Sequence, residues 1–122
     1  MERLNLYDTN CAMYKSFDLI SKKWMLLILL LFWKSPYEEF RFTNFERMLP
    51  SVTSRVISMR LKELEEYKII EKINNSGKIT YKLTQVGINL VDVYNVLQKW
   101  THTNGICDCN GSCELCRKII IK

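Results

Sequence analysis

The middle of the chain reads RFTNFERMLPSVTSRVISMRLKELEEYKIIEK over residues 41–72. Thr43 and Glu46 have the spacing of a capping box, which predicts a short helix over residues 44–49. A tight connection follows, and a longer helix is expected over residues 53–67. This part of the chain therefore predicts two helices separated by a short turn.

The second of these helices is amphipathic. Ile57, Leu61 and Leu64 recur at i, i+4 and i+7, which predicts one inward-facing stripe. Arg60 lies beside that stripe, where it is expected to serve packing or a structural ion pair. A polar stripe on a helix is usually just a solvated surface. Here the stripe follows a tight turn, and this position favours a contact with DNA. The opposite, outward face carries Arg55, Ser58, Met59 and Lys62.

A β-hairpin is predicted directly after this helix. Two short runs, IIEKIN and KITYKLT, are separated by Asn75, Ser76 and Gly77. The second run alternates apolar and polar residues, as strands do, and Asn and Gly at the tip tolerate a positive φ. The strands carry three lysines, so the hairpin is expected to be basic: Lys72, Lys78 and Lys82.

Helices are also predicted on both sides of this unit. Residues 16–35 divide at Ser21 into two helices, and the second is so apolar that we expect it to lie at the centre of the core. Thr84 is expected to cap a last long helix over residues 85–100. That helix has more apolar surface than one small core needs.

Composition places these elements in one ordinary domain. The chain has 122 residues, 48% hydrophobic and 25% charged, with 18 Lys and Arg against 13 Asp and Glu, which gives a net charge of +5. A basic balance favours polyanionic partners such as nucleic acid. The longest uncharged apolar stretch, residues 24–33, is about half of a membrane span, and the charged N-terminus lacks a signal core. We therefore expect a cytoplasmic protein with no membrane partner.

The order helix, turn, helix and basic hairpin predicts a winged helix-turn-helix. The fold class is mainly α with a small β-hairpin wing, with about five helices and a Cys-rich C-terminal tail. Residues 1–100 form the DNA-binding and dimerisation domain and residues 101–122 the tail. The helix over residues 53–67 has the width to fill the major groove of double-stranded DNA, while the lysines of the wing neutralise phosphates. Arg55 is the leading candidate for a base contact, and the full set of candidates is Thr53, Ser54, Arg55, Ser58, Met59, Lys62, Lys78 and Lys23.

The chain also resembles the HxlR group of winged-helix transcription regulators, which is related to the MarR type. The resemblance is carried by Cys11, by FDLISKKW at residues 17–24, by residues 41–72 and by YKLTQVG at residues 81–87. It implies a homodimer held by the N-terminal and last helices on palindromic operator DNA. It also implies that Cys11 is a thiol sensor of oxidants or electrophiles. From the residues alone, a small buried hydrophobe is the more common role for such a cysteine.

The tail contains CDCNGSCELC over residues 107–116. Four thiolates in a flexible, Gly-containing segment suit one soft metal ion, zinc or iron, and an iron–sulfur cluster is a further candidate. The spacing matches neither the usual zinc-finger pattern nor a ferredoxin run, so disulfides, a thiol switch or a tail without function stay open. The candidate metal ligands are Cys107, Cys109, Cys113 and Cys116.

Other classes of function have less support. The chain has no phosphate-binding glycine loop and no nucleophile elbow, so no enzyme is expected. A thiol-disulfide redox protein using Cys113 and Cys116 would lack the βαβ setting of that motif. The main alternative is a winged-helix module that docks on another protein. Steep salt dependence of duplex binding would distinguish the regulator from this alternative.

Overall fold

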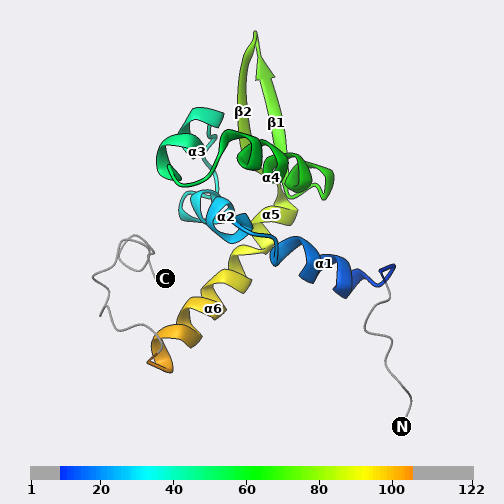
Figure 1. The fold of residues 1–122 in the computed structure, drawn as a ribbon, viewed down its shortest axis with the longest axis vertical. Coiled ribbons are helices and arrows are strands. Elements are labelled where there is room, and N and C mark those ends of the chain that lie inside the picture. Colours follow the sequence, from blue (N-terminus) through cyan, green and yellow to red (C-terminus); the bar gives the residue numbers. More distant parts are fainter. Residues whose placement is uncertain (1–8, 106–122) are drawn as a thin grey trace.

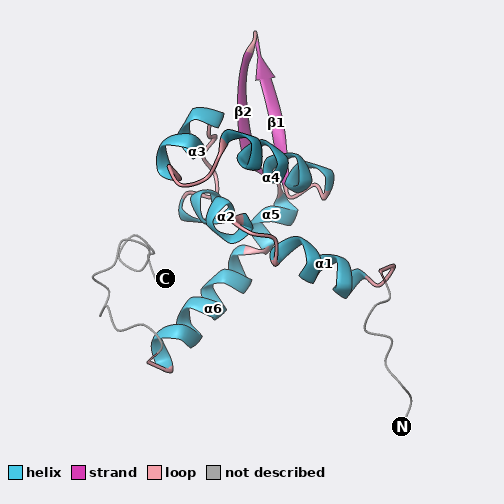
Figure 2. Ribbon diagram, in the orientation of Figure 1, coloured by secondary structure: helices cyan, strands magenta, loops and turns pink. Residues whose placement is uncertain are grey.

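The computed structural model describes residues 9–105, and Figure 1 shows a head of helices and a hairpin from which two helices extend. Figure 2 shows that the described part is mainly helical, with one β-hairpin, as predicted. The elements in chain order are α1 (Ala12–Ile20), α2 (Met25–Lys34), α3 (Phe42–Met48), α4 (Ser54–Glu66), β1 (Ile70–Asn75), β2 (Lys78–Leu83), α5 (Gln85–Asn89) and α6 (Val91–Thr103).

Helix α2 is the centre of the core, as its uniform apolarity predicted. Met25, Ile28 and Phe32 on it have no solvent exposure. The Phe32 ring lies 5.2 Å from the Phe45 ring of α3 and 5.6 Å from the Phe40 ring, measured between centroids. Aromatic pairs at such distances contribute beyond the area they bury. This cluster fixes α3 on α2 and thereby supports the helix-turn-helix.

Helix α3 begins two residues earlier than predicted. The expected capping box of Thr43 and Glu46 is wrong, because the N-cap residue is Arg41 and its backbone N–H donates to Asn44 Oδ1 at 2.8 Å. Because the helix begins at Phe42, Asn44 is its third residue. Asn44 therefore has the capping role that was predicted for Glu46. Glu46 is thereby free for another partner.

Helix α4 begins and ends with recognisable caps. Thr53 Oγ1 accepts the backbone N–H of Val56 at 3.3 Å, which confirms the predicted start. At the other end, Ile69 N–H donates to the Leu64 carbonyl and Lys68 N–H donates to the Glu65 carbonyl, both at 2.9 Å. These two bonds form a Schellman motif, which requires a left-handed residue. Lys68 adopts it with φ of 60°.

The hairpin is the wing predicted from the sequence, and its tip differs in one detail. Asn75 pairs with Lys78, so the loop has two residues, Ser76 and Gly77, with φ of 52° and 88°. Two successive positive φ values match the right-handed twist of the strands. The two residues with positive φ are thus Ser76 and Gly77, while Asn75 is the last residue of β1. The neighbouring Asn74 Oδ1 accepts the Gly77 N–H at 3.0 Å and holds the turn.

The predicted last helix is divided at Leu90 into α5 and α6. Thr84 Oγ1 accepts the Gly87 N–H at 3.3 Å, so the predicted cap is confirmed. A Cβ on Gly87 would lie 2.2 Å from the Ile69 carbonyl oxygen, which shows how closely α5 packs on the start of β1. Tighter bonds, Leu90 N–H to the Gly87 carbonyl and Val93 N–H to the Leu90 carbonyl, separate the two helices. This break lets α6 leave the head (Figure 1).

Candidate DNA-binding surface

Helix α4 presents its polar face to solvent. Ile57, Leu61 and Leu64 are at most 1% exposed and pack into the core, as predicted. The predicted outward residues Arg55, Ser58, Met59 and Lys62 are all exposed. Burial of the apolar stripe therefore fixes which side of α4 meets solvent. A helix presented in this way has the width that the major groove of a duplex admits.

Two further predicted residues, Thr53 and Ser54, are exposed and already hold the turn before α4. The Thr53 hydroxyl caps the helix, as described above. The Ser54 hydroxyl donates to Glu46 Oε2 at 2.5 Å and joins α4 to α3. The structure therefore assigns these hydroxyls a structural role. Sequence reasoning missed Glu46 as the partner, because its predicted role was a cap within α3.

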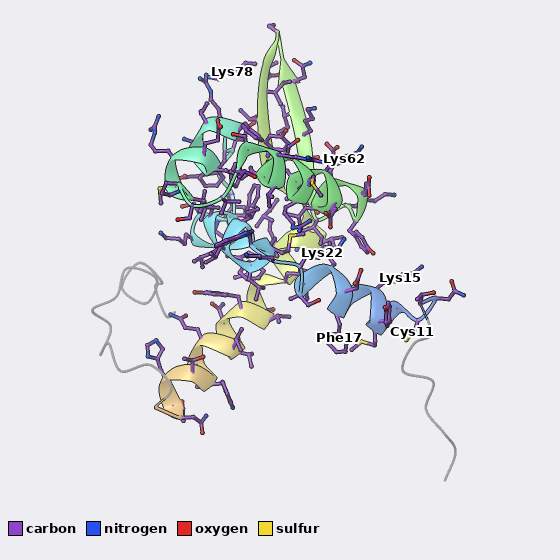
Figure 3. The ribbon with its side chains drawn as sticks, in the orientation of Figure 1. Cys11, Lys15, Phe17, Lys22, Lys62 and Lys78 are labelled. Atoms are coloured by element: carbon purple, nitrogen blue, oxygen red, sulfur yellow. The ribbon has the colours of Figure 1, made fainter. Side chains whose placement is uncertain are left out.

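The two predicted lysines outside α4 lie in different places. Lys78 is exposed on the wing, and Figure 3 shows it apart from Lys62 on α4. Lys23 is exposed in the connection between α1 and α2, where its Nζ lies 5.1 Å from the centroid of the Trp24 ring. That distance fits a cation–π contact. The predicted cations are thus spread over the head.

An ion-pair network lies beside the polar face of α4. Arg60 Nη1 lies 2.6 Å from Glu63 Oε1, and Lys22 Nζ lies 2.6 Å from Glu63 Oε2. Arg60 Nε also donates to the Lys23 carbonyl at 3.0 Å. The predicted role of Arg60 as packing or a structural ion pair is confirmed as the ion pair. The hydrogen bond from Lys22 to Glu63 raises the pKa of Lys22, so this lysine is charged throughout the neutral range.

Sequence reasoning missed Glu63 as the centre of this network. Its spacing of three residues from Arg60 was a usable signal, since i,i+3 pairs are neighbours on a helix. The contact between Lys22 and Glu63 joins residues far apart in sequence, so no local sequence pattern predicts it. Sequence reasoning also left out Arg41 and Arg47, which are exposed at the start and in the last turn of α3.

Cys11 is an exposed free cysteine at the N-cap of α1. In the single described chain this cysteine is therefore not a buried core residue. Lys15 lies one turn farther along the same helix, and Figure 3 shows both residues with the exposed Phe17. The predicted metal ligands Cys107, Cys109, Cys113 and Cys116 lie outside the described residues. Within residues 9–105, no group of three or more His, Cys, Asp or Glu could hold a metal ion.

A polar-faced helix after a tight turn, followed by an antiparallel hairpin, defines a winged helix-turn-helix protein. A family model described as HxlR-like helix-turn-helix matches residues 19–107. The chain belongs to the HxlR family and is a transcriptional regulator of the HxlR and MarR-like type. Its relatives and fold neighbours are regulators rather than enzymes, as the sequence predicted. Along residues 9–105, no helix is long and apolar enough to cross a membrane.

Two relatives from Bacillus subtilis illustrate the match. The transcriptional regulator YodB is 31% identical over 97 residues, which cover 76% of this chain and 84% of YodB. The uncharacterised regulator YvaP is 33% identical over 89 residues, which cover 70% of this chain and 80% of YvaP. Both matches cover more than two thirds of this chain.

Solved structures agree with these matches. The reduced form of YodB superposes with a TM-score of 0.66 at 29% identity, over 75% of this chain and 90% of YodB. YodB has also been solved in quinone-bound and diamide-treated forms. A possible HxlR family factor from Thermoplasma volcanium gives a TM-score of 0.65 at 21% identity, over 88% of this chain and 97% of that one. At that identity the likeness shows a shared fold alone.

Proposed function

We propose that this chain is a sequence-specific double-stranded DNA-binding regulator that acts in the cytoplasm as a homodimer on a palindromic operator. The observation that carries the proposal is the exposed polar face of α4, backed by a buried stripe and followed by a basic hairpin. In helix-turn-helix proteins the second helix enters the major groove and the first crosses the backbone. Here α4 and α3 take these roles.

The side chains divide by the part of DNA that they can reach. Arg55 in the first turn of α4 has the donors for a bidentate contact with guanine, while Ser58 and Met59 suit base edges and thymine methyls. Lys62, Lys23 and the wing residue Lys78 supply phosphate contacts. Thr53 and Ser54 place the start of α4 and present backbone N–H groups near the DNA.

The homodimer is supported by apolar surface that the described chain leaves uncovered. Val96 and Trp100 on α6 are 68% and 54% exposed, and Phe17 on α1 is 63% exposed. Val96 and Trp100 lie one turn apart on α6, and exposed apolar residues that cluster in this way commonly mark a protein interface. A pair of α6 helices with α1 alongside would present two copies of α4. Two half-sites one helical turn apart would require a separation of about 34–36 Å.

Arg55→Ala tests the DNA contact, with Lys99→Ala on α6 as a control that removes a cation far from α4. A duplex first has to be selected from random DNA by the unmodified protein. We expect Arg55→Ala to cost about 1–3 kcal/mol of binding and to relax specificity at one base pair. The control should stay close to the unmodified protein. Binding should fall steeply with added salt. Binding that does not respond to salt would favour docking on a protein instead.

We also propose that Cys11 responds to electrophiles. Its exposure on α1, and the quinone-bound form of the relative YodB, support this role. In the proposed step the Cys11 sulfur adds to a ring carbon of a quinone, and the thiol proton is transferred, which leaves a hydroquinone thioether. After quinone treatment, mass spectrometry should find the adduct on Cys11, and the unmodified protein should lose operator binding. The Cys11→Ser variant should keep operator binding after the same treatment. An adduct that leaves operator binding unchanged would contradict the role.

The tail cysteines are a separate proposal that rests on sequence alone. Cys107, Cys109, Cys113 and Cys116 would hold one zinc ion or an iron–sulfur cluster through their thiolates. The segment directly follows α6, so an occupied site would lie beside the proposed dimer helix.

A further inference from the structure

Helix α1 is attached to the head mainly at its C-terminal end. Leu19 is its one buried residue, whereas Met13 and Phe17 are 59% and 63% exposed. With one buried residue, α1 depends strongly on the connection to α2 for its direction. That connection covers residues 21–24 and ends at Trp24, which has φ of 72°.

Helix α4 binds this connection at two consecutive residues. Arg60 Nε donates to the carbonyl of Lys23 across a sequence separation of 37 residues, and Glu63 forms its ion pair with Lys22. Arg60 and Glu63 are also paired with each other, so the four groups form one network rather than separate contacts. Helix α4, which is proposed to read DNA, is therefore joined directly to the base of α1, one of the two helices proposed to form the dimer.

The ion-pair network is partly buried, and this raises the energetic cost of removing one of its members. The Arg60 and Glu63 side chains are 15% and 18% exposed, whereas Lys22 is 36% exposed. Removing one partner from such a group leaves the remaining charges without compensation, and this costs more than breaking a surface pair. The guanidinium is planar and holds its donors in a fixed direction, so the bond to the Lys23 carbonyl also fixes an angle.

We infer that Arg60 and Glu63 are positioning residues that set the angle between α1 and α4, and through it the relative placement of the two α4 helices in the dimer. The inference rests on the proposed function. One head needs only its own α4 and wing to bind a half-site. Two heads on one palindrome also need the correct separation. Binding of the first head raises the affinity of the second only when both heads can reach their half-sites at the same time.

The test compares a full palindrome with a duplex that contains one half-site, using the operator selected by the unmodified protein. Glu63→Gln keeps the shape of the side chain and removes both ion pairs. Glu66→Gln is the matched control, since it removes the same charge from an exposed position at the end of α4. Lys22→Met removes only the partner outside α4, and Lys22→Arg should restore the pair.

We expect Glu63→Gln and Lys22→Met to weaken binding to the full palindrome about tenfold and to change half-site binding less than about twofold. Their preference for half-site spacing should become broader. Lys22→Arg and Glu66→Gln should behave like the unmodified protein on both duplexes.

Two results would overturn the inference while leaving the proposed function intact. One is an equal loss on both duplexes in folded variants, which would mean a local effect on α4. The other is no difference between Glu63→Gln and Glu66→Gln. If Glu63→Gln does not fold, Lys22→Met decides by the same comparison, because it keeps the pair within α4. If the unmodified protein selects no duplex from random DNA, the proposed function is rejected and the inference with it.

Discussion

Lys68 adopts a backbone conformation that normally belongs to glycine. It follows α4 with φ of 60°, and its N–H bonds to the Glu65 carbonyl in the Schellman motif. A side chain in the left-handed region costs about 1–2 kcal/mol. The strain lies between the proposed DNA-reading helix and the wing, and the two hydrogen bonds of the motif maintain it.

Lys68→Gly is expected to stabilise the protein by about 0.5–1 kcal/mol. The gain is the relief of left-handed strain, reduced by the greater freedom of glycine in the unfolded chain. Chemical denaturation should show a higher midpoint with an unchanged slope. Lys68→Ala is the control, since it removes the same charge and keeps the strain. Equal stabilisation by alanine would attribute the effect to charge instead.

Individual residues also show what could be predicted from the sequence. The stripe of Ile57, Leu61 and Leu64 was predictable because helical periodicity decides burial locally. The start of α3 was not, because Asn44 and Glu46 both offered a side-chain acceptor and only the surrounding fold selects one. The ion pair of Lys22 and Glu63 joins residues far apart in sequence, and no local pattern encodes it.

Among the elements, the wing and α4 followed from short-range patterns, whereas the division at Leu90 did not. The apolar periodicity of residues 85–100 is continuous, so it predicted one helix. The break lies three residues after Gly87, which packs closely on the Ile69 carbonyl, and this tertiary contact has no signal in the periodicity. The break directs α6 away from the head, on the side opposite the hairpin (Figure 1), and leaves its apolar residues exposed.

Val96→Glu is expected to convert the proposed dimer to a monomer without unfolding the head. Val96 is 68% exposed in the single chain, so glutamate is tolerated there. A dimer would bury its charge at a cost. Sedimentation analysis should report half the mass, and circular dichroism should be unchanged. Asn95→Glu introduces the same charge at the neighbouring exposed position and should remain dimeric. A dimeric Val96→Glu protein would exclude this face as the interface.

For the molecule as a whole, the order of elements and the excess of basic residues predicted the fold class that the comparisons confirm. Composition could not place the cations, since Lys22 is engaged by Glu63 whereas Lys62 and Lys78 are exposed. The described part ends at residue 105, before the cysteine segment. Chemical analysis of bound metal tests the proposed site in that segment.

Protein purified without oxygen is expected to contain about one zinc ion or one iron–sulfur cluster per chain. Elemental analysis and labile-sulfide assay distinguish the two. Replacing Cys107 and Cys116 with serine should remove the metal, and Cys11→Ser should retain it. Anaerobic protein without metal would exclude the site and leave disulfides or a thiol switch for these cysteines.

A short antiparallel bridge joins the backbone of Phe40, in the segment before α3, to that of Tyr81 in β2. Their backbones exchange two hydrogen bonds, at 2.7 and 2.8 Å, and Thr80 adds a bond to Glu39. Because residue 40 precedes α3 and residue 81 lies in β2, the bridge closes a loop that contains α3, α4 and most of the wing. Local opening of that loop must break the bridge, so the amide protons of these two residues should exchange with solvent together, at the rate of cooperative unfolding rather than of fraying.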